Sequence, residues 1–173
     1  MLGEIIAPET PVASTPDTPA EARPFDPADS TVLIVDDNEP NLELLQAYLG
    51  ELKCRTLLAR DGAEALEQFR NASPDLVLLD IMMPRMSGFQ VCEAIRRDEG
   101  ETRTPVLMVT ALNQVADVER ALEAGADEFL TKPVDRRELL VRVQSQLKIH
   151  HLRRELRAAR AEVAHLRDQS TPD

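Results

Sequence analysis

The sequence has little aromatic character, with no tryptophan and only 3% Phe and Tyr, so its core has to be built from aliphatic side chains. Hydrophobic residues make up 43% of the 173 residues, which is enough for such a core. Apolar runs are far shorter than the roughly 20 residues of a membrane-spanning helix. Residues 1–10 have neither the basic segment nor the apolar stretch of a secretion signal. We therefore expect a cytoplasmic chain without membrane contact.

Cysteine and histidine are also scarce. We expect Cys54 and Cys92 to be small apolar side chains in a reducing compartment, and no Cys or His spacing resembles a zinc site. All three histidines, His150, His151 and His165, lie near the C-terminus. We expect them to be solvated or to lie at an interface.

The net charge of −11 is unevenly distributed. An acidic body does not favour binding to nucleic acid, and we expect none. Residues 148–168 carry more basic than acidic side chains, so this part of the chain could contact an acidic partner.

Composition divides the chain into four parts. Residues 1–30 are acidic and hold six of the twelve prolines, which predicts a disordered N-terminal extension. Residues 31–147 have the patterning of a folded domain, residues 148–168 continue its last helix, and residues 169–173 form a polar tail.

Five short apolar segments alternate with five helical patterns between residues 31 and 169. The predicted strands are residues 32–35, 54–59, 76–79, 106–109 and 129–130. The predicted helices begin near residues 38, 62, 88, 114 and 135, and the last continues to residue 169. This alternation predicts an α/β fold, a doubly wound five-stranded parallel sheet with helices on both faces and a C-terminal helical extension.

Polar residues follow four of the predicted strands. Asp36 and Asp37 follow the first, Asp80 the third, Thr110 the fourth and Lys132 the fifth. Ligands of open parallel sheets bind at the carboxyl ends of the strands. We therefore expect these five side chains to converge, although they are almost a hundred residues apart in sequence.

The residue types in this pocket indicate phosphoryl transfer. Three carboxylates repel each other unless a cation offsets their charge, and oxygen ligands without His or Cys favour Mg²⁺. Asp80 can attack phosphorus and carry an acyl phosphate. Lys132, the Thr110 hydroxyl and the Ala111 N–H can bind phosphoryl oxygens. Each residue alone could instead be a helix cap, a turn residue or a solvated charge.

Four segments resemble the receiver domains of two-component response regulators. They are VLIVDD at 32–37, LVLLDIMMPRMSG at 76–88, PVLMVTA at 105–111 and GADEFLTKP at 125–133. The resemblance covers about residues 31–147. It implies a flavodoxin-like fold and a phosphorylation-dependent signalling switch rather than an enzyme with turnover of its own.

The resemblance also implies roles in the pocket. Asp80 resembles the phospho-acceptor. Asp36, Asp37 and the backbone carbonyl of Met82 resemble the ligands that hold Mg²⁺ together with Asp80. Lys132 resembles the lysine that binds the phosphoryl group. The implied partner is a histidine kinase or a histidine phosphotransfer protein that supplies this group.

Three further residues resemble the parts that transmit the signal. Thr110 and Phe129 resemble the switch residues, which move together when the acceptor is phosphorylated. Pro133 resembles a proline preceded by a cis peptide bond. The resemblance implies a change in the surface of the fourth helix, the fifth strand and the last helix.

Two other functions are alternatives to a terminal switch, and the sequence argues against the second. The chain could be an intermediate of a multi-step phosphorelay, which passes its phosphoryl group on to a histidine. A haloacid-dehalogenase-like phosphatase also uses an aspartate nucleophile on an α/β sheet, with a second Asp two residues later, but Asp36, Asp37 and Asn38 break that spacing.

The lifetime of a phosphoryl group depends on the residues beside the path of the attacking water. Met82 and Leu112 lie two residues after Asp80 and Thr110, and both are apolar. We therefore expect slow autodephosphorylation, over minutes or longer. The alternative is that both are exposed packing residues.

The last helical pattern carries an apolar stripe beyond the domain. Its members are spaced by three and four residues and are Ile149, Leu152, Leu156, Ala159, Val163 and Leu166. This spacing predicts a coiled coil, most simply in a parallel homodimer. The stripe could instead fold back on its own domain or meet a helix of another protein. Because no output-domain motif follows, we expect the output to be protein–protein contact.

Overall fold

The centre of the computed structural model, which describes residues 24–99, 103–111 and 115–169, is a five-stranded sheet. Its strands are β1 (Thr31–Val35), β2 (Arg55–Ala59), β3 (Leu76–Leu79), β4 (Val106–Thr110) and β5 (Glu128–Thr131). They lie in the order β2-β1-β3-β4-β5, and every neighbouring pair is parallel. The fold class predicted from the sequence is confirmed.

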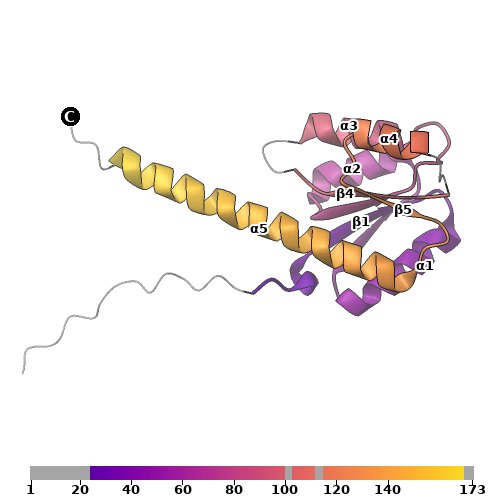
Figure 1. The fold of residues 1–173 in the computed structure, drawn as a ribbon, viewed down its shortest axis with the longest axis horizontal. Helices are drawn as coiled ribbons and strands as arrows, with labels where there is room; N and C mark the ends of the chain where they lie inside the picture. Colours follow the sequence, from indigo (N-terminus) through magenta and orange to yellow (C-terminus); the bar gives the residue numbers. More distant parts are fainter. Residues whose placement is uncertain (1–23, 100–102, 112–114, 170–173) are drawn as a thin grey trace, which may run out of the picture.

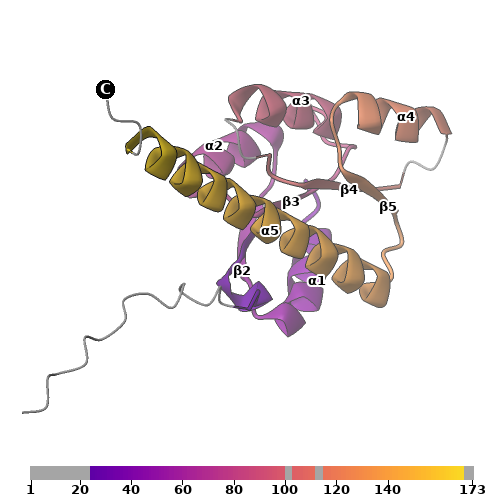
Figure 2. The ribbon, with the colours of Figure 1, turned by 60° about the vertical axis from the view of Figure 1, so that its left-hand side comes forward.

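Helices cover both faces of this sheet (Figure 1). They are α1 (Glu39–Leu49), α2 (Gly62–Ala72), α3 (Gly88–Asp98), α4 (Val115–Glu123) and α5 (Arg136–Gln169). The helices α1 and α5 lie on one face, and α2, α3 and α4 lie on the other, as the turned view in Figure 2 also shows. Two short 3₁₀ helices, η1 (Pro27–Asp29) and η2 (Gly50–Leu52), complete the described elements.

The side chains of the inner strands are buried on both faces, as parallel sheets require. In β1, Leu33 packs on the side of α2 and α3, whereas Ile34 packs on the side of α1 and α5. Both side chains are fully buried, and each burial contributes roughly 1.5–3 kcal/mol to folding. The core is almost wholly aliphatic, as expected from the composition.

Helix caps fix where the chain turns after the first three strands. The side chains of Asn38 and Asp61 accept hydrogen bonds from the backbone N–H groups of Asn41 and Glu64. Ser87 forms a capping box with Gln90 at the start of α3. These caps start three helices close to the carboxyl edge of the sheet, because each satisfies an N–H group that the helix leaves unpaired.

The end of the N-terminal extension differs from the prediction of disorder up to residue 30. Residues 27–29 form η1, and the Asp26 side chain accepts a hydrogen bond from the N–H of Ala28. Phe25 packs against the core on the α1 and α5 face, with its ring 5.4 Å from that of His151. This aromatic side chain has apolar surface to bury, which the composition of the segment as a whole concealed. Residues 1–23 lie outside the described part of the chain.

The helix α5 continues without a break past the receiver-like domain and projects beyond the amino edge of the sheet (Figure 1). Two contacts fix its direction there. The His150 Nδ1 atom lies 3.2 Å from the Arg103 carbonyl oxygen, and Arg154 donates a 2.9 Å hydrogen bond to Asp75. The expectation that His150 is solvated or interfacial is therefore wrong, since only 5% of it is exposed. Burial lowers the pKa of His150.

The two cysteines differ in how deeply they are buried. Cys92 is buried, and its burial raises the pKa of the thiol to about 11, whereas Cys54 is only partly buried.

Among the helices of the described residues, none has the length and apolarity to cross a bilayer.

A glycine pair tests how tightly the carboxyl edge is packed. A Cβ atom at Gly88 would lie 2.8 Å from the Ile81 Cα and would collide with the Asp80 carbonyl oxygen. We expect Gly88→Ala to lower the free energy of unfolding by about 1–3 kcal/mol in chemical denaturation. Gly50→Ala is the matched control, because this position is αR and has no atom within 4 Å of a Cβ. It should be neutral or stabilising by up to ~1 kcal/mol. Equal losses in both variants would contradict this packing.

Candidate functional site

The three aspartates that follow β1 and β3 lie together at the carboxyl edge of the sheet. Asp36, Asp37 and Asp80 each offer one carboxylate oxygen, and these oxygens lie within 4.8 Å of one another. The pairing of the two strands brings them together, since β1 and β3 are neighbours and the Asp80 N–H donates a 2.9 Å hydrogen bond to the Val35 carbonyl. Asp36 and Asp80 are buried, whereas Asp37 is exposed.

Lys132 brings a positive charge to these aspartates from the end of β5. Its Nζ atom lies 2.6 Å from the Asp36 Oδ2 atom and 3.3 Å from the Asp80 Oδ2 atom. The Lys132 N–H donates a 2.8 Å hydrogen bond to the Thr110 carbonyl, which holds the residue beside the end of β4. The side chain is only 21% exposed, so Lys132 is not the solvated lysine of the alternative interpretation.

A residue that the sequence analysis missed completes the surroundings of Asp36. The Asn41 side-chain amide donates to both Asp36 carboxylate oxygens at 3.1 Å. The Asn38 N–H donates to the Oδ1 atom at 2.9 Å. Asn41 stands in the first turn of α1, so an amide at that place after Asp36 was the available signal. These bonds hold the Asp36 carboxylate in one orientation.

The surroundings of Asp80 disfavour its ionised form. Burial raises the pKa of Asp80, and the charge of Asp36 raises it further, whereas Lys132 lowers it. The Asp80 carboxylate accepts a long hydrogen bond, 3.4 Å, from the Met82 N–H. The burial effect is the largest, so the ionised carboxylate of Asp80 is short of positive charge in this structure.

The donor set fits a hard divalent cation such as Mg²⁺. The three carboxylate oxygens lie within 4.8 Å of one another, and carboxylate oxygens are the ligands that Mg²⁺ prefers. Asp37 is exposed, which leaves a side for the waters that Mg²⁺ retains. A cation here would also offset the mutual repulsion of Asp36 and Asp80.

The other residues singled out in the sequence lie around the same edge. Thr110 ends β4 and is fully buried, and Ala111 beside it is exposed. Phe129 is half-buried against the core on the α2, α3 and α4 side. The peptide bond between Lys132 and Pro133 is cis. The Met82 side chain is 60% exposed, and Leu112 lies outside the described residues.

Comparison with known proteins identifies the family. The model of the response regulator receiver domain matches residues 32–144. The chain is 41% identical over 130 residues to the response regulator PleD of Caulobacter vibrioides. This match covers 75% of this chain and 29% of PleD. It is 39% identical over 117 residues to the DNA-binding dual master transcriptional regulator RpaA of a Synechocystis species, covering 68% of this chain and 48% of RpaA.

Solved structures agree with this assignment. A response regulator receiver domain protein (CheY-like) from Methanospirillum hungatei superposes with a TM-score of 0.66 at 29% identity. The match covers 72% of this chain and 98% of that one. The chain therefore belongs to the response regulator receiver family, a family of signalling domains that interact with histidine kinases and bind Mg²⁺ at an acidic pocket. It spans about half, or less, of the length of the curated relatives that it matches.

The raised pKa of Asp80 leads to a prediction on stability. Without a divalent cation, the ionised carboxylate is less favourable in the folded state than in the unfolded state. We therefore expect Asp80→Asn to raise the thermal midpoint at pH 7 in the presence of EDTA. The gain should shrink as the pH falls, because Asp80 is then neutral in both states. Thermal unfolding followed by circular dichroism measures both effects, and a lower midpoint for Asp80→Asn at pH 7 would contradict them.

Proposed function

We propose that this chain is a phosphorylation-dependent switch of a two-component system, with Asp80 as the phospho-acceptor. The observation that supports this most is the position of the Lys132 amine, which lies within 3.3 Å of the Asp80 carboxylate inside a group of three aspartates. Asp80 would take the phosphoryl group from a histidine kinase or a histidine phosphotransfer protein. The family relationship supports the kinase as the partner.

The residues of the pocket would divide the chemistry among them. Asp36 and Asp37 would hold Mg²⁺ with Asp80 and the Met82 carbonyl, and the ion would neutralise charge on the transferring phosphoryl group. An Asp80 oxygen would attack phosphorus, and the bond to the donor would break. Lys132 would pair with one phosphoryl oxygen, since its amine is already beside Asp80. The Thr110 hydroxyl and the Ala111 N–H would bind the others.

Phosphorylation of Asp80 would shift the population of the chain from one arrangement of the fold to another. The new acceptor oxygens on Asp80 would draw the Thr110 hydroxyl, and Phe129, half-buried nearby on β5, would turn into the space that opens. The surface of α4, β5 and α5 would change as a result. Dimerisation through α5 or contact with another protein would carry the signal. We expect no direct binding to nucleic acid.

Phosphorylation with a small-molecule donor tests the acceptor. With acetyl phosphate and Mg²⁺, we expect the intact mass of the wild-type chain to increase by one phosphoryl group, and no increase for Asp80→Asn. Lys132→Ala should reduce the extent strongly, because the amine that pairs with the phosphoryl group is lost. Arg60→Ala, which removes an exposed ion pair with Glu39, is the matched control and should leave it unchanged. Labelling of Asp80→Asn to the wild-type level would exclude the proposal.

The apolar side chain of Met82 leads to a prediction on lifetime. Met82 is 60% exposed and cannot orient an attacking water by hydrogen bonding. We expect the purified phosphorylated chain to lose its label over minutes or longer, and Met82→Glu to shorten this time. Loss within seconds from the wild type would contradict the expectation. Incubation of the labelled chain with histidine phosphotransfer proteins separates a terminal switch from a relay intermediate, since only the latter passes the label on.

A further inference from the structure

The apolar stripe on the extension of α5 lies on the face opposite to the one that packs against the receiver domain. It consists of Ile149, Leu156 and Val163 at the a positions of a heptad repeat and Leu152, Ala159 and Leu166 at its d positions. Buried residues of the same helix, Leu147 and His150, occupy the opposite f and b positions. The receiver domain therefore leaves the stripe largely exposed, and Leu156 lies at the edge of a cavity that Arg103 and Asp127 also line. The alternative of an extension folded back on its own domain does not describe this structure.

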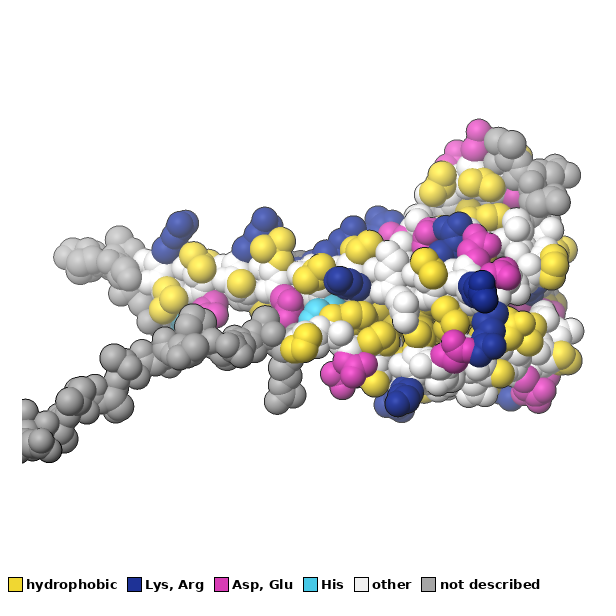
Figure 3. Space-filling model, turned by 60° about the horizontal axis from the view of Figure 1, so that its bottom comes forward, with side chains coloured by type: hydrophobic (Ala, Val, Ile, Leu, Met, Phe, Trp, Pro, Cys, Tyr) yellow, Lys and Arg dark blue, Asp and Glu magenta, His cyan; other side chains and the backbone are white. Residues whose placement is uncertain are grey.

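The exposed fraction of the stripe is large for apolar side chains. Leu152, Leu156 and Leu166 are 50%, 52% and 56% exposed. Figure 3 shows apolar side chains at regular intervals along the projecting helix. The preceding a and d positions, Arg142 and Ser145, are polar, so the apolar stripe begins at Ile149. A partner surface is thus confined to the extension.

The charges beside the stripe favour a second copy of this chain as the partner. The e positions are all basic and consist of Arg153, Arg160 and Arg167. Of the g positions, Glu155 and Glu162 are acidic, whereas Lys148, which precedes the stripe, is basic. In a parallel in-register pair, each g residue faces the e residue five positions later in the other helix. Glu155 then faces Arg160 of the other copy, and Glu162 faces its Arg167.

An antiparallel arrangement would reverse this complementarity. It places e beside e and g beside g, which brings arginine to arginine and glutamate to glutamate. β-branched residues at two a positions and leucine at two d positions further favour a two-stranded parallel coil. One parallel pair is repulsive, that of Lys148 with Arg153, so two of the three pairs on each side attract.

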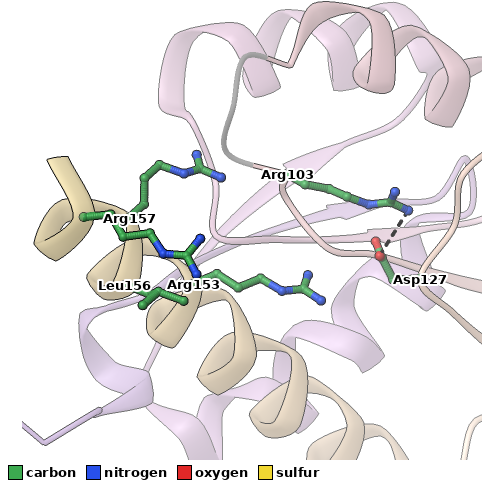
Figure 4. Close-up of a pocket in the computed structure, with 6 residues that line it drawn as sticks. Arg103, Asp127, Arg153, Leu156 and Arg157 are labelled. Atoms are coloured by element: carbon green, nitrogen blue, oxygen red, sulfur yellow. Dashed lines mark ion pairs between the residues drawn. The ribbon is translucent and has the colours of Figure 1, made fainter. Parts of the chain in front are cut away.

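A cavity beside the extension is lined by Arg153, one member of the repulsive pair. Arg153, Arg157 and Arg160 line this cavity of about 590 Å³ together with Arg103 (Figure 4). Asp127 is the carboxylate among its described lining residues, and it already pairs with Arg96 and Arg103. Arg153 points into the cavity (Figure 4). A glutamate from a second helix beside Arg160 would reduce the excess positive charge.

We infer that residues 148–167 form a parallel, in-register, two-stranded coiled coil with a second copy of this chain, whether or not Asp80 is phosphorylated. The inference rests on the homodimer included in the proposed function. Independence from phosphorylation follows because the stripe is already exposed along the projecting helix in the unphosphorylated chain. Phosphorylation would then act on two receiver domains that are already joined, and of the two outputs in the proposed function, contact with another protein would carry the signal.

Cysteine cross-linking tests the orientation and the register. In the parallel coil, Leu166→Cys places the two thiols opposite each other at a d position, within reach of a disulfide. In an antiparallel coil over the same stripe, residue 166 faces residue 149, and the two thiols are about 25 Å apart. Ala161→Cys, at an outer f position, is the matched control. The parent chain supplies the background from the partly buried Cys54 and the buried Cys92.

Charge exchange tests the pairing itself. Glu155→Arg with Glu162→Arg, or Arg160→Glu with Arg167→Glu, should each weaken the homodimer about tenfold or more in sedimentation, and a mixture of the two variants should recover a heterodimer. Thermal unfolding of the receiver domain checks that each variant is folded.

All measurements use the unphosphorylated chain in EDTA, so a failure of the phosphorylation pocket leaves them unaffected. We expect cross-linking of Leu166→Cys, not of Ala161→Cys, and recovery on mixing. A monomeric wild-type chain, a dimer without the Leu166→Cys cross-link, or equal cross-linking of both cysteines would overturn the inference.

Discussion

The contact of one lysine with two buried carboxylates organises the carboxyl edge of this molecule. Lys132 reaches Asp36 at 2.6 Å and Asp80 at 3.3 Å from a strand that is separated from β3 by β4. Asp36 is held by Asn38 and Asn41, whereas burial leaves the pKa of Asp80 raised. The pocket thus contains one carboxylate with fixed orientation and one that gains from further positive charge. A divalent cation in the pocket would supply this positive charge.

The amino edge of the sheet, opposite to the pocket, holds α5 in place. Asp75 accepts a hydrogen bond from the Thr31 N–H and another from Arg154, and it precedes β3, the strand that ends at Asp80. The same helix closes the core through Leu139, Val143 and Leu147. A single rigid helix therefore connects the domain to its exposed apolar stripe. Any rearrangement of the domain face that includes α5 would be carried to the stripe as a rigid-body movement.

Much of this arrangement could be predicted from the sequence, and the reasons for the failures are physical. Strand ends were marked by polar residues after short apolar runs, and the order of parallel strands then brought Asp36, Asp80 and Lys132 together. The hydrogen bonds of Asn41 to Asp36 were not predicted, because an amide side chain in the first turn of a helix can have several different partners. His150 was misjudged because heptad spacing describes the stripe and says nothing of the face that the domain covers. Phe25 was concealed within a segment of otherwise polar and proline-rich composition.

Isothermal titration with Mg²⁺, followed by beryllofluoride, tests the central claim on the pocket most directly. The account predicts one Mg²⁺ per chain, loss of binding in Asp37→Asn, and uptake of beryllofluoride only after the metal has bound, because the anion needs the cation to approach Asp80. Beryllofluoride binding without Mg²⁺, or Mg²⁺ binding unaffected by Asp37→Asn, would contradict it.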